Sequence, residues 1–210
     1  MEPFCGSCSV VGAMTGPRIA HDINPHLIAL WQAVQAGLFN YPEAVSEKIY
    51  RECRSRKAQA EPDPLLAFIG FGCSFGGKWF GGFARGKDDG RIKDYCRIAA
   101  DSLCRKAVNL RGVEFFCKDY RSLIPRGCLI YCDPPYRGTT KYQFSGSFNS
   151  DEFWETMRRW SADNTVVVSE FAAPADFQQI AEFPSLSMAE LPPVRLEPKN
   201  FSRIMRNRLT

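Results

Sequence analysis

Apolar residues follow two kinds of spacing along the chain, and the two spacings predict alternating strands and helices. Compact apolar runs predict strands at residues 113–117, 128–132 and 165–169, and residues 18–24 predict a short strand that ends in polar residues. Apolar residues three or four positions apart predict a helix after residue 24 and two more at 92–108 and 151–160, the last with Ser150 as its N-cap. Strands that are apolar throughout are typical of parallel sheets covered on both faces. The pattern therefore predicts an α/β fold.

Residues 42–112 interrupt this alternation. Helical stretches with basic side chains lead there into residues 71–85, where glycine, aromatic and cationic residues are mixed too densely for a packed helix or a regular strand. We therefore predict a discontinuous main domain at 1–41 and 113–190, an insertion of helices and loops at 42–112, and a basic C-terminal tail at 191–210.

Composition indicates a globular protein but does not indicate what it binds. Of the 210 residues, 45% are hydrophobic and 24% are charged, which is typical of a globular domain and not of a disordered chain. Nine cysteines without an export signal indicate a reducing compartment, and no apolar run reaches the roughly 20 residues that span a bilayer. The formal net charge of +4 lies wholly in residues 195–210. An argument for nucleic-acid binding therefore has to rest on local clusters of cations.

The sequence Asp133-Pro134-Pro135-Tyr136 directly follows a predicted strand. Ligands of open parallel sheets bind at this carboxyl end. Prolines have no N–H to compete for backbone carbonyls, so the Asp133 carboxylate and the Pro134 carbonyl can form a pair of acceptors for an –NH2 group. Tyr136 offers a flat face on which a base can stack. These four residues alone leave open a proline-terminated strand with a solvent-facing aspartate.

A second candidate site combines a glycine turn with an acidic residue. The segment Glu2-Pro3-Phe4-Cys5-Gly6 contains the turn, and Asp22 lies near the end of the first predicted strand. Glycine lets a ligand approach the backbone closely, and a carboxylate at a strand end can accept hydrogen bonds from ribose hydroxyls. The spacing is not GxGxxG, so the turn alone is equally compatible with a cysteine-rich surface loop.

Cys5 and Cys8 suggest other chemistries, which the rest of the sequence disfavours. A thioredoxin-type redox pair requires a strand and a helix before the CxxC motif, and a papain-type nucleophile requires a distant histidine; the sequence provides neither. A zinc site formed by Cys5, Cys8, Cys128 and Cys132 is a minor alternative to free thiols.

Six segments occur in an order that is far more specific than any one of them: EPFCGSC, RIAHDINPHLIALW, GFGCSFGGKWFGGFARGK, VEFFCKDY, LIYCDPPYRGTTKY and TVVVSEF. Together they resemble the adenine-specific DNA methyltransferases of the DNA adenine methylase type, especially bacteriophage members. The resemblance covers about residues 2–175. It implies a Rossmann-like, S-adenosylmethionine-dependent methyltransferase sheet, with residues 1–41 and 113–190 as the catalytic domain and 42–112 as a target-recognition insertion.

The resemblance also implies a reaction and its partners. The methyl group of S-adenosylmethionine would pass to the exocyclic amine of adenine in double-stranded DNA, by in-line attack that depends mostly on positioning. No metal is implied. We expect a monomer without a membrane partner, in the cytoplasm of a bacterial host or phage-infected cell, where such enzymes can belong to restriction-modification systems.

Residue roles follow from the resemblance by position. For the cofactor, the turn on the methionine side would comprise Glu2, Pro3, Phe4 and Gly6, while Asp22 would hold the ribose and Asp119 would lie near the adenine, with Asp133 also counted among the cofactor contacts. For the target, Asp133 and Pro134 would accept hydrogen bonds from the amine of a flipped adenine, with Pro135 completing the motif and Tyr136 stacked on the base.

Candidate DNA contacts lie in the insertion and after the Asp133 motif. In the insertion, Lys78, Arg85 and Lys87 could contact phosphates or base edges, and Trp79 and Phe80 could stack or act as wedges. The alternative is that Trp79, Phe80 and Phe83 form the small core of the insertion. Arg137 and Lys141 flank the Asp133 motif and are further phosphate-contact candidates.

The chain also departs from the family that it resembles. Relatives begin with a lysine-containing, cofactor-contacting motif and a first central strand, which the resemblance implies are missing here; the closing strands of the family are not recognisable after Pro184. We therefore expect weak or no binding of S-adenosylmethionine. Two alternatives to an adenine methyltransferase stay open, namely a DNA methyltransferase acting on the exocyclic amine of cytosine and a truncated, non-catalytic DNA-binding remnant.

Overall fold

The computed structural model describes residues 1–59, 61–135, 148–184 and 201–207. The chain divides into two compact units, unit 1 with Met1–Phe4 and Asp119–Thr210, and unit 2 with Cys5–Lys118. The predicted limits of the insertion both fall inside unit 2, so the division into catalytic domain and insertion stays a prediction. Within the described ranges, no helix combines the length and the apolar character needed to cross a membrane.

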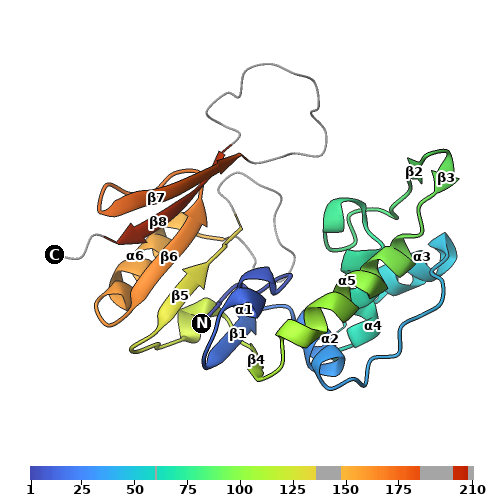
Figure 1. Ribbon diagram of the computed structural model, residues 1–210, viewed down its shortest axis with the longest axis horizontal. Helices are drawn as coiled ribbons and strands as arrows, with labels where there is room; N and C mark the ends of the chain where they lie inside the picture. Colours follow the sequence, from blue (N-terminus) through green and yellow to red (C-terminus); the bar gives the residue numbers. More distant parts are fainter. Residues whose placement is uncertain (60, 136–147, 185–200, 208–210) are drawn as a thin grey trace, which may run out of the picture. The chain divides into compact units, whose positions relative to one another are not determined.

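Unit 1 is built on a four-stranded mixed sheet with the strand order β5-β6-β8-β7 (Figure 1). Strands β5 (Leu129–Cys132) and β6 (Thr165–Glu170) run parallel. Helix α6 (Ser150–Ser161) lies between them in the chain, as the sequence pattern predicts for a parallel pair. Strand β8 (Phe201–Asn207) is antiparallel both to β6 and to β7 (Phe177–Pro184).

The first residue of the chain extends the hydrogen bonding of β5. The Met1 ammonium donates to the Leu129 carbonyl over 2.7 Å, and the Tyr131 N–H donates to the Met1 carbonyl over 3.0 Å. These two bonds flank Ile130 as in a parallel ladder. They anchor Met1–Phe4 in unit 1, whereas the chain from Cys5 onward belongs to unit 2.

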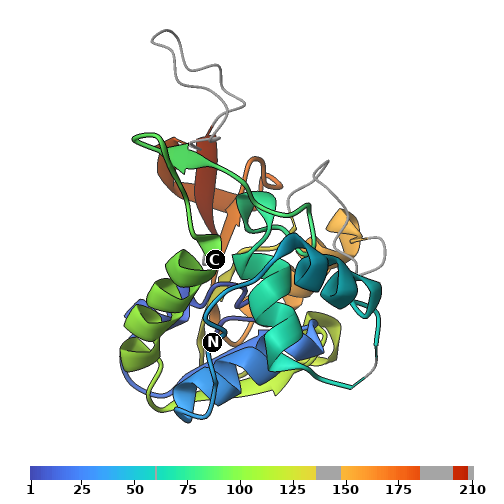
Figure 2. The same cartoon turned by 90° about the vertical axis from the view of Figure 1, so that its right-hand side faces the viewer.

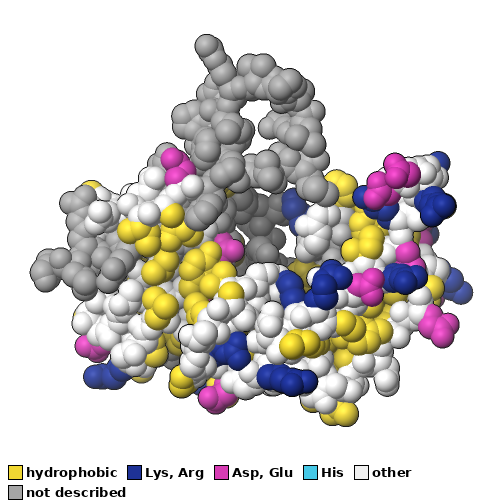
Figure 3. All heavy atoms as spheres, in the orientation of Figure 1, with side chains coloured by type: hydrophobic (Ala, Val, Ile, Leu, Met, Phe, Trp, Pro, Cys, Tyr) yellow, Lys and Arg dark blue, Asp and Glu magenta, His cyan; other side chains and the backbone are white. Residues whose placement is uncertain are grey.

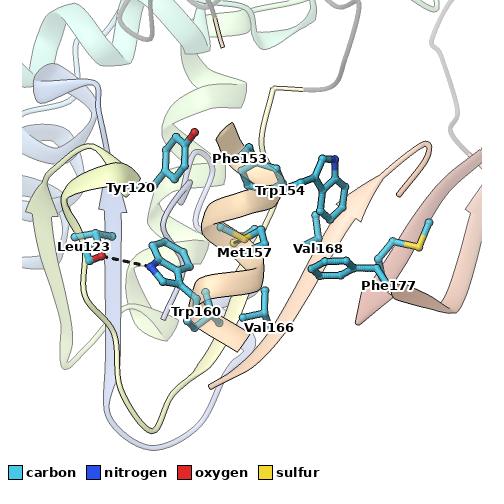
Figure 4. Close-up of a cluster of buried hydrophobic side chains, with 12 residues drawn as sticks. Tyr120, Leu123, Phe153, Trp154, Met157, Trp160, Val166, Val168 and Phe177 are labelled. Atoms are coloured by element: carbon cyan, nitrogen blue, oxygen red, sulfur yellow. Dashed lines mark hydrogen bonds between the residues drawn. The ribbon is translucent and has the colours of Figure 1, made fainter. Parts of the chain in front are cut away.

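The core of unit 1 forms where α6 packs on the sheet (Figure 4). Trp154, Met157 and Trp160 recur at helical spacing, so they share the face of α6 that is buried against Val166 and Val168. The Trp160 indole N–H donates to the Leu123 carbonyl over 3.3 Å, which satisfies a polar group inside this core.

Unit 2 contains a parallel pair of strands, β1 (Arg18–Asp22) and β4 (Val113–Cys117), in register from Arg18 with Val113 to Asp22 with Cys117. The helix α2 (Pro25–Gln35) packs on this pair through Leu27, Ile28 and Trp31. Its N-cap is Asn24, whose side-chain oxygen accepts the N–H groups of His26 and Leu27. The short helix α1 (Ser9–Ala13) precedes β1 within a stretch for which the sequence predicts only turns.

The remainder of unit 2 is mainly helical. It comprises α3 (Glu47–Ser55), α4 (Pro64–Ala67), the π-helical turn η1 (Phe68–Gly72), the 3-10 turn η2 (Phe75–Gly77), the hairpin β2 (Lys87–Asp88) and β3 (Arg91–Ile92), and α5 (Tyr95–Asn109). A second buried cluster, with Leu66, Phe68 and Ile69 at its centre, holds these helices together. The hairpin extends beyond them, at the N-terminal end of α5 (Figures 1 and 2).

The structure confirms a mixed α/β fold with parallel strand pairs, but it corrects three details. The parallel pairs β1–β4 and β5–β6 lie in separate sheets, and the larger sheet has antiparallel strands as well. The N-cap of α6 is Asn149, whose side-chain oxygen accepts from the N–H groups of Asp151 and Glu152, so Ser150 is the first helical residue. Strands β7 and β8 are not predicted, because polar residues interrupt their apolar positions.

Candidate functional site

Asp133 follows β5 directly, at the carboxyl end of the parallel pair β5–β6. Its side chain is exposed, whereas Pro134 is buried and Pro135 is half-buried. This places an exposed carboxylate at the end of a sheet where ligands of parallel strands bind, next to two prolines that restrict the backbone. The other predicted residues of this region, Tyr136, Arg137 and Lys141, lie outside the described residues.

The negative charge of Asp133 acts on Tyr131, two residues earlier in the chain. Burial raises the pKa of the Tyr131 phenol, the Asp133 charge raises it further, and a hydrogen bond with Ser169 lowers it. Tyr131 therefore stays neutral beside the Asp133 carboxylate. The phenol adds a polar, uncharged group to this edge of unit 1.

Two polar residues at the end of β6 complete this edge, and neither is among the site residues predicted from the sequence. Because Cys132 pairs with Val168, the segment after β5 runs beside Ser169 and Glu170. Both are buried, with exposed fractions of 5% each, and Glu170 accepts the Phe171 N–H over 2.7 Å. The available signal was a pair of polar residues that ends an otherwise apolar strand.

In unit 2, the glycine turn and the predicted ribose-binding acid are joined directly. Asp22 is the last residue of β1, and its Oδ2 accepts the Gly6 N–H over 3.1 Å. Its Oδ1 accepts the Asn24 N–H over 2.9 Å. An ionised carboxylate has about four acceptor positions in all, and the N–H of Ile23 also acts on this one, so about one position remains for a further donor.

The environment of Asp22 changes its proton affinity. Burial raises the pKa of this carboxyl group, and the backbone N–H groups of Asn24, Gly6 and Ile23 oppose that shift because they stabilise the charged form. Gly6 itself has a positive φ of 42°, and a Cβ atom built there would meet nothing within 4 Å. The turn therefore leaves space beside its backbone.

The remaining predicted turn residues belong to unit 1. Glu2 and Pro3 are buried, and Glu2 is only 3% exposed. The Phe4 ring packs against Tyr120, with centroids 5.0 Å apart, and against Phe153 at 5.9 Å. Phe4 is thus a core residue of unit 1.

Asp119 is occupied by a neighbouring arginine. Its Oδ1 accepts hydrogen bonds from the backbone N–H and the Nε–H of Arg121, at 2.9 and 3.0 Å. Its Oδ2 accepts a hydrogen bond from Nη2 of the same arginine at 2.5 Å. This bidentate pair holds the pKa of Asp119 below its usual range. A role near a cofactor adenine stays a prediction, and any donor there would compete with Arg121.

The three predicted DNA-binding cations of the insertion are exposed. Lys78 follows η2 and Lys87 lies in β2. Arg85 forms an ion pair with Glu47, which also pairs with Arg51. Phosphate would have to compete with Glu47 for Arg85, so Lys78 and Lys87 are the more accessible contacts.

The packing alternative for Trp79 and Phe80 is the one that the structure favours. The Trp79 ring stacks on His26 with centroids 5.7 Å apart and packs on Phe71 at 4.9 Å. Phe80 is 3% exposed. Both rings therefore belong to the core of the insertion, which disfavours the predicted stacking of Trp79 on DNA.

A different aromatic residue, Phe75, is presented to solvent. It is 70% exposed on η2, next to Gly76 and Gly77, which both adopt a φ of 64° that disfavours other residues. The loop is closed at its base, because the Phe75 N–H donates to the Gly82 carbonyl over 2.8 Å. Phe75 is not among the site residues predicted from the sequence; the signal for its exposure is the Gly-Gly pair that follows it.

The β2–β3 hairpin carries exposed cations and an exposed apolar residue on its strands. Asp89 and Gly90 form the two-residue turn with positive φ values of 47° and 76°, the geometry that matches strand twist in hairpins. Ile92 is 82% exposed, and Lys93 pairs with Asp88 over 3.6 Å. Figure 3 shows basic side chains interspersed with acidic ones over the hairpin and α5, so this surface is mixed in charge.

The residues thus gather into three candidate surfaces, namely the Asp133 edge of unit 1, the Gly6–Asp22 turn of unit 2 and the exposed loops of the insertion. Within the described ranges, no three or more His, Cys, Asp or Glu side chains are grouped as a metal site would need. No protein-family model matches the chain, and no curated protein matches it.

Proposed function

We propose that the chain is an adenine-specific DNA methyltransferase that uses S-adenosylmethionine. The observation that carries the proposal is the hydrogen bond between Gly6 and Asp22, which joins a glycine turn to an acid at the end of a parallel strand. Nucleoside-containing cofactors are bound by this combination in α/β folds. Asp133, at the end of a second parallel strand, supports the same class.

The finer fold assignment is part of this proposal. Each unit contains one parallel pair, β1–β4 in unit 2 and β5–β6 in unit 1, and each pair has a motif aspartate at its carboxyl end. In open α/β sheets, ligands bind at that end. We therefore propose the Rossmann-like methyltransferase class, with the resemblance of the six segments as further support.

The residues of the turn suit the proposed cofactor. Asp22 keeps about one acceptor position for a ribose hydroxyl, and the open side of Gly6 admits a ligand close to the backbone. S-adenosylmethionine supplies a methyl group bound to a positively charged sulfur, and so needs no metal activation. The protein has to hold it and present the amine that receives the methyl group.

Asp133 would act on the receiving amine. The lone pair of the adenine amine is delocalised into the ring, which makes the amine a poor nucleophile. The Asp133 carboxylate and the Pro134 carbonyl would each accept one amine hydrogen, which favours a more tetrahedral nitrogen with a localised lone pair. Placing this nitrogen in line with the methyl group would supply much of the remaining acceleration.

Duplex DNA is the proposed substrate because the insertion presents stacking and phosphate-binding groups. Phe75 is 70% exposed beside Lys78, on a turn whose glycines fix its direction. The hairpin adds Lys87 and Arg91. Cations would neutralise phosphates, and an aromatic ring can insert between bases when a nucleotide leaves the stack.

The test is transfer of a tritiated methyl group from S-adenosylmethionine to duplex DNA by the purified chain, with the cofactor at high concentration. We expect transfer by the wild type and loss of transfer with Asp133→Ala. Asp163→Ala is the matched control, because this exposed carboxylate of the same unit pairs with Arg126 at 3.7 Å, away from the motif. Equal transfer by both variants would refute the role of Asp133.

The same assay separates the two alternatives. Label recovered on cytosine would favour the enzyme class that methylates the cytosine amine. DNA binding with no transfer at any cofactor concentration would favour the non-catalytic remnant.

A further inference from the structure

One carboxylate of the insertion holds two arginines that are far apart in the sequence. Glu47, the first residue of α3, accepts a hydrogen bond through Oε1 from Nη2 of Arg51 over 2.7 Å. Its Oε2 accepts a hydrogen bond from Nη2 of Arg85, 38 positions later in the chain. The bonds from Arg51 and Arg85 hold the pKa of Glu47 below its usual range, so the carboxylate stays ionised. The two guanidinium groups therefore converge on one point of the surface.

The two arginines come from different parts of the insertion. Arg51 lies in the middle of α3. Arg85 directly follows the closed glycine-rich loop, whose base is fixed where the Ala84 N–H donates to the Cys73 carbonyl over 2.9 Å. The guanidinium carbon of Arg85 also stands 6.0 Å from the centroid of the Phe83 ring, within cation–π range. The pair of arginines thus joins α3 to the base of the loop that presents an exposed aromatic ring.

Both arginines keep donors for a further anion. A guanidinium has five N–H groups, and among the residues that the structure describes, Arg51 and Arg85 each donate one hydrogen bond, to Glu47. Their side chains are 73% and 70% exposed. Two positive charges surround one negative charge, so the group has an excess of one positive charge. An anion with two neighbouring acceptor oxygens suits such guanidinium groups.

From this geometry we infer that Arg51 and Arg85 together bind one phosphodiester of the DNA backbone, and that Glu47 competes with this phosphate. The choice of DNA as the partner rests on the proposed function. The two non-bridging oxygens of a phosphodiester, like the oxygens of a carboxylate, are a pair of acceptors, so the phosphate can take the place that Glu47 holds in the free protein. Phe75 lies on the loop before Arg85, so a phosphate bound there would also anchor the loop proposed to stack on a base.

The exposure of the cluster is the reason to assign competition to Glu47. An exposed ion pair contributes little to holding side chains in place, whereas an ionised carboxylate repels a phosphate brought next to it. Removal of the Glu47 charge should therefore strengthen DNA binding. The sequence indicated Arg85 as a DNA contact but not Arg51, because their shared partner is visible only in the fold.

The experiment measures affinity for a fluorescently labelled DNA duplex by anisotropy at a series of salt concentrations. The variants are Glu47→Gln, Arg51→Met, Arg85→Met and the double variant with both arginines replaced. The controls are Glu52→Gln and Arg54→Met, which make the same charge changes elsewhere on α3. Both control residues are exposed, and neither side chain forms an ion pair within the described part of the chain.

We expect Arg51→Met and Arg85→Met each to weaken duplex binding about fivefold, as for a hydrogen bond to a charged group. The double variant should lose little more affinity than either single variant, because both side chains contact the same phosphate. Its slope of log affinity against log salt should fall by about one, the change for one lost phosphate contact. Glu47→Gln should strengthen binding about threefold, and both controls should change it by less than about twofold.

Three results would each overturn the inference. These are additive losses in the double variant with a change in salt slope of about two, losses no larger than that of Arg54→Met, and a Glu47→Gln variant that binds no more tightly than the wild type. Methyl transfer by the wild type would leave the proposed function intact in all three cases. The expected binding pattern without any methyl transfer would refute the proposed function alone, and a wild type that does not bind duplex DNA would refute both.

Discussion

The Gly6 N–H donates to Oδ2 of Asp22 over 3.1 Å and joins segments that are 16 positions apart. The bond ties the glycine turn to the end of a strand, and Asp22 is itself held by its pairing with Cys117 in β4. A ligand bound by the turn would therefore meet the Asp22 carboxylate at a defined place. Several expectations depend on this relationship and on the packing that supports it.

The proton affinity of Asp22 predicts how cofactor binding depends on pH. Burial raises the pKa of Asp22, so the carboxylate becomes protonated at a higher pH than an ordinary aspartate. An ionised carboxylate is the stronger acceptor for ribose hydroxyls. We expect the affinity for S-adenosylmethionine to fall as the pH is lowered through this raised pKa, as read by NMR titration at a series of pH values.

The variant Asp22→Asn separates this effect from other titrating groups. Asparagine keeps a side-chain oxygen for the Gly6 N–H but carries no charge. We expect affinity reduced about tenfold at neutral pH and no pH dependence of the kind seen in the wild type. A variant with the wild-type pH profile would assign the titration to another residue.

A buried hydroxyl network is expected to hold the exposed loop of the insertion. The Ser74 hydroxyl donates to the Gly70 carbonyl at 2.6 Å, so it accepts from the Tyr50 hydroxyl at 2.7 Å, and Tyr50 in turn accepts the Gly82 N–H at 3.1 Å. Tyr50→Phe should lower the free energy of unfolding by about 1–3 kcal/mol, because buried partners lose their hydrogen bonds.

Urea denaturation measures this loss, and a double-mutant cycle with Ser74→Ala isolates the Tyr50–Ser74 contribution. Tyr95→Phe is the control, because the hydroxyl of that half-buried tyrosine has no hydrogen-bond partner among the residues that the structure describes. A loss for Tyr50→Phe no larger than the control would contradict the importance of the network.

Close packing around η1 predicts opposite effects of the same substitution at two glycines. A Cβ atom at Gly70 would lie 2.6 Å from Cζ3 of Trp79 and 2.8 Å from Cε2 of Phe80. Gly70→Ala should therefore destabilise the protein by about 1–3 kcal/mol or more. At Gly12, in α1, the nearest atoms would be 3.6 and 3.7 Å away. Gly12→Ala should be neutral or stabilise by up to about 1 kcal/mol.

Melting temperatures of the two variants provide the comparison. If the melting temperature of Gly70→Ala equals that of the wild type, the Trp79 and Phe80 rings are not closely packed on η1. Their assignment to the core would then be wrong.

The exposure of Phe75 predicts a loss of DNA binding without a loss of stability. The ring is 70% exposed, so Phe75→Ala removes little buried area. If the ring stacks on a base, duplex affinity should fall about tenfold, within the range of a stacking contact. Fluorescence anisotropy with a labelled duplex measures the change, and Ile98→Ala, at a half-exposed position on α5, is the control. Equal affinities for the two variants would exclude Phe75 from the interface.

The sequence predicted those elements that have a continuous local pattern with clear ends. The strand at 113–117 was found at Val113–Cys117, because its apolar run is bounded by glycine and a charged segment. By contrast, β8 pairs on both sides in the sheet although its sequence is interrupted by arginines. The pairing of β6 and β7 around it decides its structure, and no local pattern records that.

Within the candidate sites, the sequence predicted where a residue lies along a strand. It did not predict which other side chains that residue contacts. The sequence placed Asp22 and Asp133 at the ends of strands, where the structure also has them. It did not predict that Trp79 is packed on His26 while Phe75 is exposed, because both are aromatic residues in the same glycine-rich stretch. Contacts across long sequence separations, such as Lys106 with Ser7, have no local signature.

The identity of the methylated base tests the central claim most directly. Duplex DNA is incubated with the chain and S-adenosylmethionine that carries a deuterated methyl group, and the digested nucleosides are analysed by mass spectrometry. We predict deuterated N6-methyldeoxyadenosine with the wild type and its absence with Asp133→Ala. A deuterated methyl group on cytosine alone, or methyladenine that persists in Asp133→Ala, would contradict the proposed function.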